Sequence, residues 1–195
     1  MDARSTADRP ARVATGDDGA RYDSVAMSLH WITVFLVLAN FALAETWEDF
    51  ARPTRHLMVL THMSFGTLIA LAIIARIAWR LAPGHQIPPA AAGLAELAAK
   101  VGHYLLYALL VASAILGFVL RWSGGEAMSF FGIEIPSPIP TVSRAMNHQI
   151  GELHEWVGWA IIVVAAGHAL AALYHHFVVK DDVLRRMLPG GRRAG

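Results

Sequence analysis

Four long apolar runs constrain this chain more than any other feature of its sequence. Each has about the 20 residues that an α-helix needs to cross the hydrocarbon layer of a membrane. Because lipid cannot satisfy backbone polar groups, and because the runs are too long for barrel strands, we expect them to be helices. The runs extend from Val25 to Ala44, from Leu57 to Trp79, from Val101 to Trp122 and from Glu152 to Val179.

The predicted fold class is therefore an all-α membrane protein, a four-helix transmembrane bundle. The composition agrees, because only 16% of the residues are charged, against about 25% in soluble domains. Residues 1–22 lack the apolar core of a signal peptide and are expected to form a disordered cytoplasmic tail. The bundle is expected over 23–180 and a basic cytoplasmic tail over 181–195. Its helices are expected at about 25–46, 57–80, 101–122 and 152–179.

The distribution of charge predicts the orientation of the bundle. Twelve of the 16 Lys and Arg residues lie in the N-terminal tail, between Arg76 and Lys100, or in the C-terminal tail. Basic loops stay on the cytoplasmic side, so both termini are expected inside. The two opposite loops hold four basic and seven acidic residues, which makes the outer face acidic. The chain has no cysteine, which excludes disulfides, iron–sulfur clusters and thiolate zinc sites.

Four histidines in the predicted helices pair by their depth in the membrane. His154 and His168 are 14 residues apart, which is about 21 Å of helical rise and nearly four whole turns, so they share one face of the last helix. His62 matches the outer depth of His154, and His30 matches the inner depth of His168. An unpaired ionisable group in a membrane is costly, and a metal removes that cost by taking the imidazole lone pair.

Haem fits these pairs better than a bare metal ion. Two imidazoles without a thiolate or carboxylate are too few for a closed zinc site, but they can hold a haem iron from above and below. Gly66 and Gly158 each follow a histidine of the outer pair by four residues. The absence of a side chain there leaves room for a flat macrocycle against the backbone. The alternative for both glycines is a helix-packing contact.

Two further polar residues are predicted at the inner level. Arg76 follows His62 by 14 residues and therefore lies on the same helix face. It is a candidate partner for a haem propionate, or it reaches the inner headgroups instead. His103 begins the third helix from the inside and is expected to meet a propionate or to cap the inner layer.

Several sequence words resemble a known family, the bacterial four-helix cytochrome b561 family of two-haem b-type cytochromes. The resemblance covers about residues 20–189. It implies that His30 and His168 hold the haem on the cytoplasmic side, and that His62 and His154 hold the haem on the outer side. The words are Tyr22 with SLHW at 28–31, His62 with Gly66 and Arg76, GHYLLY from Gly102, HEWVGW from His154, and GHALAALYHHFVVKDDVLRRMLP from Gly167.

Histidine on both faces leaves the iron no vacant position, so the predicted activity is one-electron transfer across the bacterial inner membrane. The resemblance adds ubiquinone as the redox partner and implies a possible superoxide:ubiquinone oxidoreductase. Family members with that activity carry a lysine three residues before the outer ligand, where this chain has Gly151. An acidic outer face also repels an anionic substrate.

The alternative is a non-catalytic electron relay or membrane anchor for a periplasmic cytochrome or dehydrogenase. An acidic outer face suits a basic redox protein. Transport is disfavoured, because transporters bind their substrates at broken helices and no apolar run here contains a proline. Membrane lipid is the expected surrounding, and no nucleic-acid partner is expected.

Overall fold

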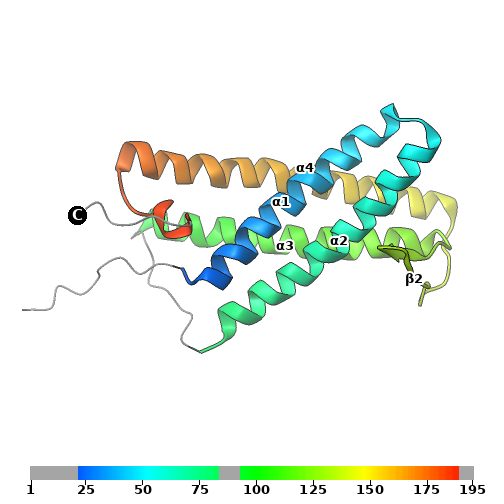
Figure 1. Cartoon of the computed structure of the whole chain (residues 1–195), viewed down its shortest axis with the longest axis horizontal. Helices are drawn as coiled ribbons and strands as arrows, with labels where there is room; N and C mark the ends of the chain where they lie inside the picture. The colour runs from blue at the N-terminus through cyan, green and yellow to red at the C-terminus, as the bar shows by residue number, and fades with distance from the viewer. Residues whose placement is uncertain (1–21, 84–92, 189–195) are drawn as a thin grey trace, which may run out of the picture.

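The computed structural model describes residues 22–83 and 93–188. It consists mainly of four long helices that run up and down in turn (Figure 1). All four are long and apolar enough to cross a membrane, so the predicted all-α four-helix transmembrane bundle is confirmed. The helices are α1 (Ser24–Thr46), α2 (Arg52–Leu81), α3 (Leu94–Ser123) and α4 (Arg144–Tyr174).

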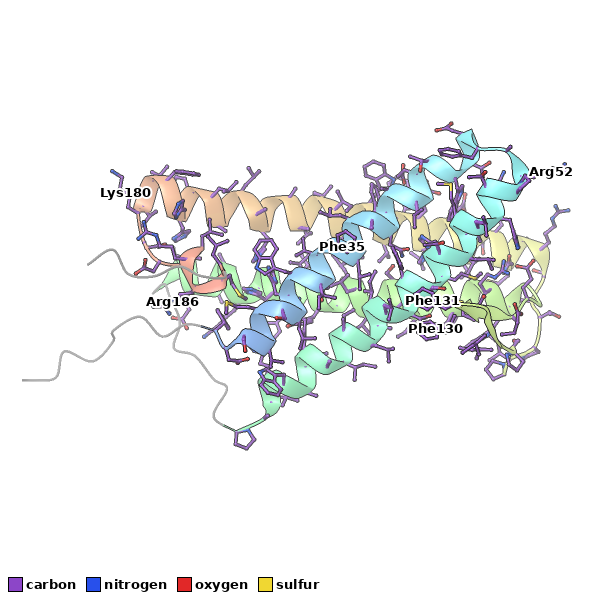
Figure 2. All side chains as sticks on the ribbon, viewed as in Figure 1. Phe35, Arg52, Phe130, Phe131, Lys180 and Arg186 are labelled. Atoms are coloured by element: carbon purple, nitrogen blue, oxygen red, sulfur yellow. The ribbon has the colours of Figure 1, made fainter. Side chains whose placement is uncertain are left out.

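The bundle has two distinct ends. We call the end at which α1 begins and α4 ends the tail end, and the opposite end the hairpin end (Figure 1). Charged side chains mark both ends: Arg52 lies at the hairpin end, and Lys180 and Arg186 lie at the tail end (Figure 2). Between them, apolar side chains such as Phe35, which is 66% exposed, form a surface suited to lipid.

The helices pack most closely as the pairs α1/α2, α3/α4 and α2/α3. Within the described residues, the backbone of α4 does not approach α1 or α2 in this way. The histidine pairs predicted from depth join α4 to these two more distant helices. The interior between α4 and the helices α1 and α2 is therefore spanned by side chains, without close contact of their backbones.

All four helices begin earlier than predicted, and three of them do so by five to eight residues. The helix expected at 57 begins at Arg52, the helix expected at 101 begins at Leu94, and the helix expected at 152 begins at Arg144. Apolarity identifies only the part of a helix that lies in lipid, whereas local capping fixes its true start. The Ser143 hydroxyl, for example, accepts a hydrogen bond from the Met146 N–H at 3.2 Å.

The connection between α3 and α4, predicted as a loop, contains a β-hairpin of strands β1 (Met128–Phe130) and β2 (Ile133–Ile135). The two residues at its turn, Phe131 and Gly132, both have positive φ, as a tight hairpin turn requires. The Phe131 N–H donates to the Ser64 Oγ of α2 at 2.9 Å. The hairpin is thus fixed against the side of α2.

The segment after α4 folds back at the tail end. Helix α4 continues into a π-helical turn, His175–Val179, and a short 3₁₀ helix follows at Arg185–Met187. The Trp31 indole N–H donates to the Met187 carbonyl at 2.8 Å. The first part of the predicted basic tail, through residue 188, therefore has a defined fold against α1. Residues 1–21 of the predicted disordered tail, and 189–195, lie outside the described residues.

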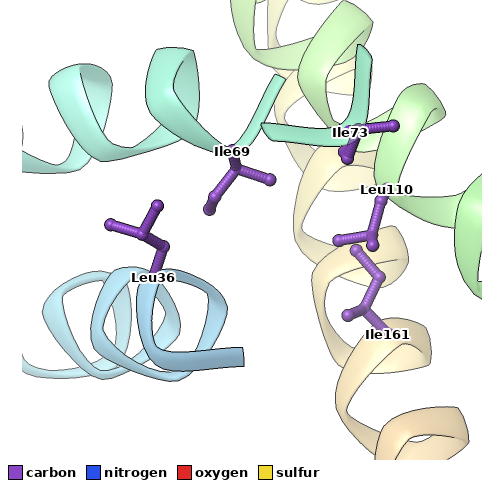
Figure 3. Close-up of a cluster of buried hydrophobic side chains, with 5 residues drawn as sticks. All are labelled: Leu36, Ile69, Ile73, Leu110 and Ile161. Carbon is purple, nitrogen blue, oxygen red and sulfur yellow. The ribbon is translucent and has the colours of Figure 1, made fainter. Parts of the chain in front are cut away.

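Buried apolar side chains from all four helices form one layer (Figure 3). Ile69 lies seven residues from both His62 and Arg76, Ile161 seven from both His154 and His168, and Leu110 seven after His103. Seven residues are nearly two helical turns, so each helix presents its polar and apolar residues in one row. The layer consists of Leu36, Ile69, Ile73, Leu110 and Ile161.

Ile73 and Ile74 provide a matched test of this layer, because Ile73 is 2% exposed and Ile74 is 64% exposed. We expect Ile73→Ala to lower the free energy of unfolding by about 2–4 kcal/mol, because it leaves a cavity among packed side chains. Ile74→Ala is expected to cost less than about 1 kcal/mol. Thermal unfolding of both variants in detergent measures the difference, and equal losses would contradict the packing described here.

Candidate functional site

Two histidines face each other near the hairpin end. His62 of α2 and His154 of α4 have ring centres 6.2 Å apart, with their planes at 85°. The His62 Nδ1–H donates to the Asn40 carbonyl of α1 at 3.1 Å. The Trp47 ring contacts the same imidazole edge-on, at 5.2 Å between ring centres. These contacts fix the orientation of His62 and leave its Nε2 as the nitrogen available for a ligand.

His154 is half-buried, and its buried Nδ1 atom is incompletely satisfied. The Ser113 carbonyl lies beside its ring, yet Nδ1 makes no hydrogen bond of good geometry. The side-chain oxygen of Asn40, near the same pair, also lacks a partner. Native interiors rarely leave such groups unpaired, because each one costs about 1–3 kcal/mol. Both orphaned atoms indicate that the region around this pair accommodates a further group.

The glycines near this pair differ in their surroundings. A Cβ built on Gly158 would meet nothing within 4 Å, and one on Gly66 would meet only the Asn40 side-chain nitrogen, at 3.8 Å. Gly158 therefore borders open space, whereas Gly66 makes an ordinary contact with the Asn40 side chain; neither position is a tight helix contact. Gly117 of α3 was not predicted, and its Cβ would lie 3.3 Å from Cε1 of His154. Its distance of 14 residues from His103 is the signal that could have identified it.

A second polar cluster lies toward the tail end. His30 of α1 is within electrostatic range of His168, His103 and Arg76. The Arg76 guanidinium is 3.4 Å from His30 Nδ1 and lies over the Tyr107 ring, 5.4 Å from its centre. Arg76 therefore points into the bundle at this level. The predicted inner residues are all brought together here by α1, α2, α3 and α4.

His103 has a defined orientation in this cluster. Its ring packs edge-on against that of His168, with the centres 5.0 Å apart. Its Nδ1–H donates to the Ala99 carbonyl of the same helix at 2.7 Å. His103 is therefore a neighbour of His168, and its Nε2 remains available for another contact.

The geometry fits a haem better than a metal ion held by protein groups alone. Two imidazoles on opposite sides of one metal, each bonded at about 2 Å, place their ring centres about 6 Å apart, close to the spacing of His62 and His154. The described residues contain no group of three or more His, Cys, Asp or Glu that could hold a metal ion. A cofactor that brings its own equatorial nitrogens needs only the two imidazoles.

Membrane-spanning helices with paired imidazoles between them define a membrane-bound b-type cytochrome. The chain belongs to the prokaryotic cytochrome b561 family, whose model matches residues 21–190. It is a multi-pass protein of the bacterial inner membrane that binds b-type haem and acts in electron transfer.

Curated relatives match over nearly their full length. Cytochrome b561 homolog 2 of Escherichia coli (strain K12) is 32% identical, with 86% of this chain and 91% of the relative covered. Cytochrome b561 homolog 1 of the same organism is 33% identical, with 87% and 97% covered. The probable superoxide oxidase CybB of Yersinia pestis is 28% identical, with 88% and 98% covered.

The contact between Gly117 and His154 can be tested by substitution. We expect Gly117→Val to displace the His154 ring, because even a Cβ at this position is tightly placed. The haem-to-protein ratio should fall below the wild-type value, because a displaced imidazole can no longer contact a haem bound in this region. Ala108→Val adds a β-branched side chain to the exposed face of the same helix and should leave the ratio unchanged. A normal ratio in Gly117→Val would contradict the expected displacement.

Proposed function

We propose that this protein carries electrons across the inner membrane on two b-type haems. His62 and His154 hold one haem near the hairpin end, and His30 and His168 hold the other near the tail end. The observation that most directly supports this proposal is the pair His62 and His154, whose rings face each other with their centres 6.2 Å apart. The tail end faces the cytoplasm in this proposal, as the distribution of basic residues predicts.

The haem supplies one-electron chemistry, and the chain's own residues hold and tune it. With an imidazole from each of two helices as its ligands, a bound haem would have no iron position for another ligand. The hydrogen bond from His62 to the Asn40 carbonyl fixes the ring and raises its basicity as a ligand. Gly66 and Gly158 add no side chain beside this pair, so they would leave space for a haem held at the hairpin end.

At the tail end, Arg76 and His103 are the proposed partners of the haem propionates. Arg76 contacts His30 and Tyr107 inside the bundle, which disfavours the alternative of a side chain that reaches only the headgroups. His103 keeps Nε2 available, because Nδ1 is used by the Ala99 carbonyl. A cation beside the haem stabilises the propionate charges and contributes to the redox potential.

The two histidine levels are separated by about 21 Å of helical rise, with the apolar layer between them. Electrons can pass from one level to the other while the buried side chains of that layer exclude water. The proposed path therefore begins at one membrane face and ends at the other. This vertical arrangement is what distinguishes a transmembrane electron carrier from a haem protein that works at one surface.

Ubiquinone is the proposed redox partner, and superoxide is one candidate electron donor. The name of the Yersinia pestis relative supports superoxide. Charge at the hairpin end favours a second candidate, a relay for a basic periplasmic redox protein. Here Arg121 pairs with Glu126 and Arg55 pairs with Glu48, so these acids neutralise positive charge that would attract an anion.

Replacing a proposed ligand should remove one haem only. We expect His62→Ala and His30→Ala each to lower the haem-to-protein ratio from two to one, because each leaves the other pair intact. His148→Ala is the control, since its side chain is 73% exposed at the hairpin end. Haem content is measured by absorption of the pyridine complex. Retention of both haems in either ligand variant would contradict the proposed pairing.

Rapid mixing of the protein with superoxide, or with a small basic cytochrome, distinguishes the two candidate electron donors. If superoxide is the donor, it should reduce the wild-type haems quickly, and ubiquinone should then reoxidise them. If the protein is a relay, it should react slowly with superoxide and exchange electrons rapidly with a small basic cytochrome. The rate of that exchange should fall as salt is added. Absorption at the haem bands follows both reactions. Fast reduction of the haems by superoxide would exclude the pure relay.

A further inference from the structure

The histidine row of α4 extends beyond the proposed haem ligands. His175 follows His168 by seven residues, the same interval that separates His168 from Ile161 and Ile161 from His154. The His175 N–H still bonds to the Ala171 carbonyl, so the helical register holds to this residue. His175 therefore lies on the same face as His168, about 10 Å nearer the tail end.

His175 is paired with a carboxylate. Its Nδ1 lies 2.5 Å from Oδ2 of Asp181, and the second oxygen of Asp181 accepts the Val183 N–H at 3.1 Å. The α-helix changes into a π-helical turn at His175–Val179, and Lys180 adopts a left-handed conformation with φ 60°. This turn brings Asp181 back under His175. π-helical turns occur often at functional sites.

The pair has the properties of a proton-binding site. A carboxylate on Nδ1–H fixes the imidazole tautomer and leaves Nε2 as the proton acceptor. The side chains of His175 and Asp181 are 23% and 27% exposed, so water at the tail end reaches them. Burial alone raises the pKa of Asp181, but hydrogen bonds from His175 and the Val183 N–H hold that pKa below its usual value.

Other charged and titratable groups surround the pair. Arg186 lies near Asp181, and Tyr174 stacks edge-on against His175. His176 is the next residue along the π-helical turn, and its Nδ1 is buried without a hydrogen bond. Asp182 and Arg185 pair with each other at 3.5 Å. Among these groups, the Asp181 carboxylate is the charged group in direct contact with the His175 imidazole.

We propose that the His175–Asp181 pair binds a proton in step with reduction of the haem at the tail end, which rests on the function proposed above. One electron arrives from the haem at the hairpin end, and Nε2 of His175 takes one proton from water at the tail end. The added negative and positive charges compensate each other. Over the helical rise of about 10 Å between His168 and His175, and at an effective dielectric constant of about 20, this interaction changes the proton affinity of His175 about tenfold between the two redox states.

The test is a redox titration of the haem-loaded full chain between about pH 5 and pH 8, the range in which imidazoles titrate. The His62→Ala variant keeps only the haem at the tail end and assigns its potential. We expect this potential to fall as pH rises, because loss of the proton from His175 disfavours the added electron. His175→Gln should make the potential independent of pH. Asp181→Asn should shift the pH dependence to lower pH.

The control is His148→Gln, which breaks a second His–carboxylate pair, with Glu152 at 3.7 Å, on the same helix but at the hairpin end. It should retain the wild-type pH dependence at the tail end. A potential that varies with pH as in the wild type in both His175→Gln and Asp181→Asn would overturn the inference, as would a wild-type potential that does not vary with pH. A lower melting temperature in Asp181→Asn, with a pH dependence that is not displaced, would also overturn it and would leave the pair as a helix cap only.

The titration separates this inference from the function on which it rests. If His62→Ala contains no haem, the proposed pairing of His30 with His168 fails, and the inference fails with it. If that haem is present and its redox potential does not vary with pH, only the proposed role of His175 and Asp181 fails. Either result is read from haem spectra and potentials, without an assay of electron-transfer activity.

Discussion

An imidazole inside a membrane must have partners for both ring nitrogens, and this requirement accounts for most of the interior of the bundle. In lipid, no water is available to complete a missing hydrogen bond. His62 uses one nitrogen on the Asn40 carbonyl and His103 uses one on the Ala99 carbonyl. The nitrogens left over point to a cofactor that binds through imidazole. The rows at seven-residue intervals on α2, α3 and α4 place these residues at two levels, with one apolar layer between them.

Helix packing makes this arrangement possible. The backbone pairs α1/α2 and α3/α4 are close, and this packing supplies the rigidity that keeps the ligands in place. Across the bundle, α4 stands away from α1 and α2 and meets them through side chains. The hairpin fixed on Ser64 closes one end, and the segment attached to Trp31 closes the other. Both ends therefore hold the helices at the separation that the interior requires.

The helices and the levels of the histidines were predictable from sequence, because apolar length and helical periodicity are properties of single segments. Contacts between segments were not. The closeness of Gly117 to His154 depends on how α3 crosses α4. The 14-residue spacing from His103 indicates the level of Gly117 in the bundle but not the side chain that it contacts. The hairpin was missed because its turn places Phe131, which is not glycine, at positive φ. The early start of α4 was missed because Ser143 and the polar first turns lie outside the apolar run. The placement of His103 beside His168 likewise required the packed structure.

Electron transfer through sealed vesicles tests the central claim most directly. The purified protein is inserted into lipid vesicles that contain a membrane-impermeant oxidant, and an impermeant reductant is then added outside. The two-haem path predicts steady loss of the enclosed oxidant, at a rate that falls to that of protein-free vesicles in His62→Ala or His30→Ala. Vesicles that contain the wild-type protein with both haems bound, yet consume the oxidant no faster than protein-free vesicles, would contradict the path.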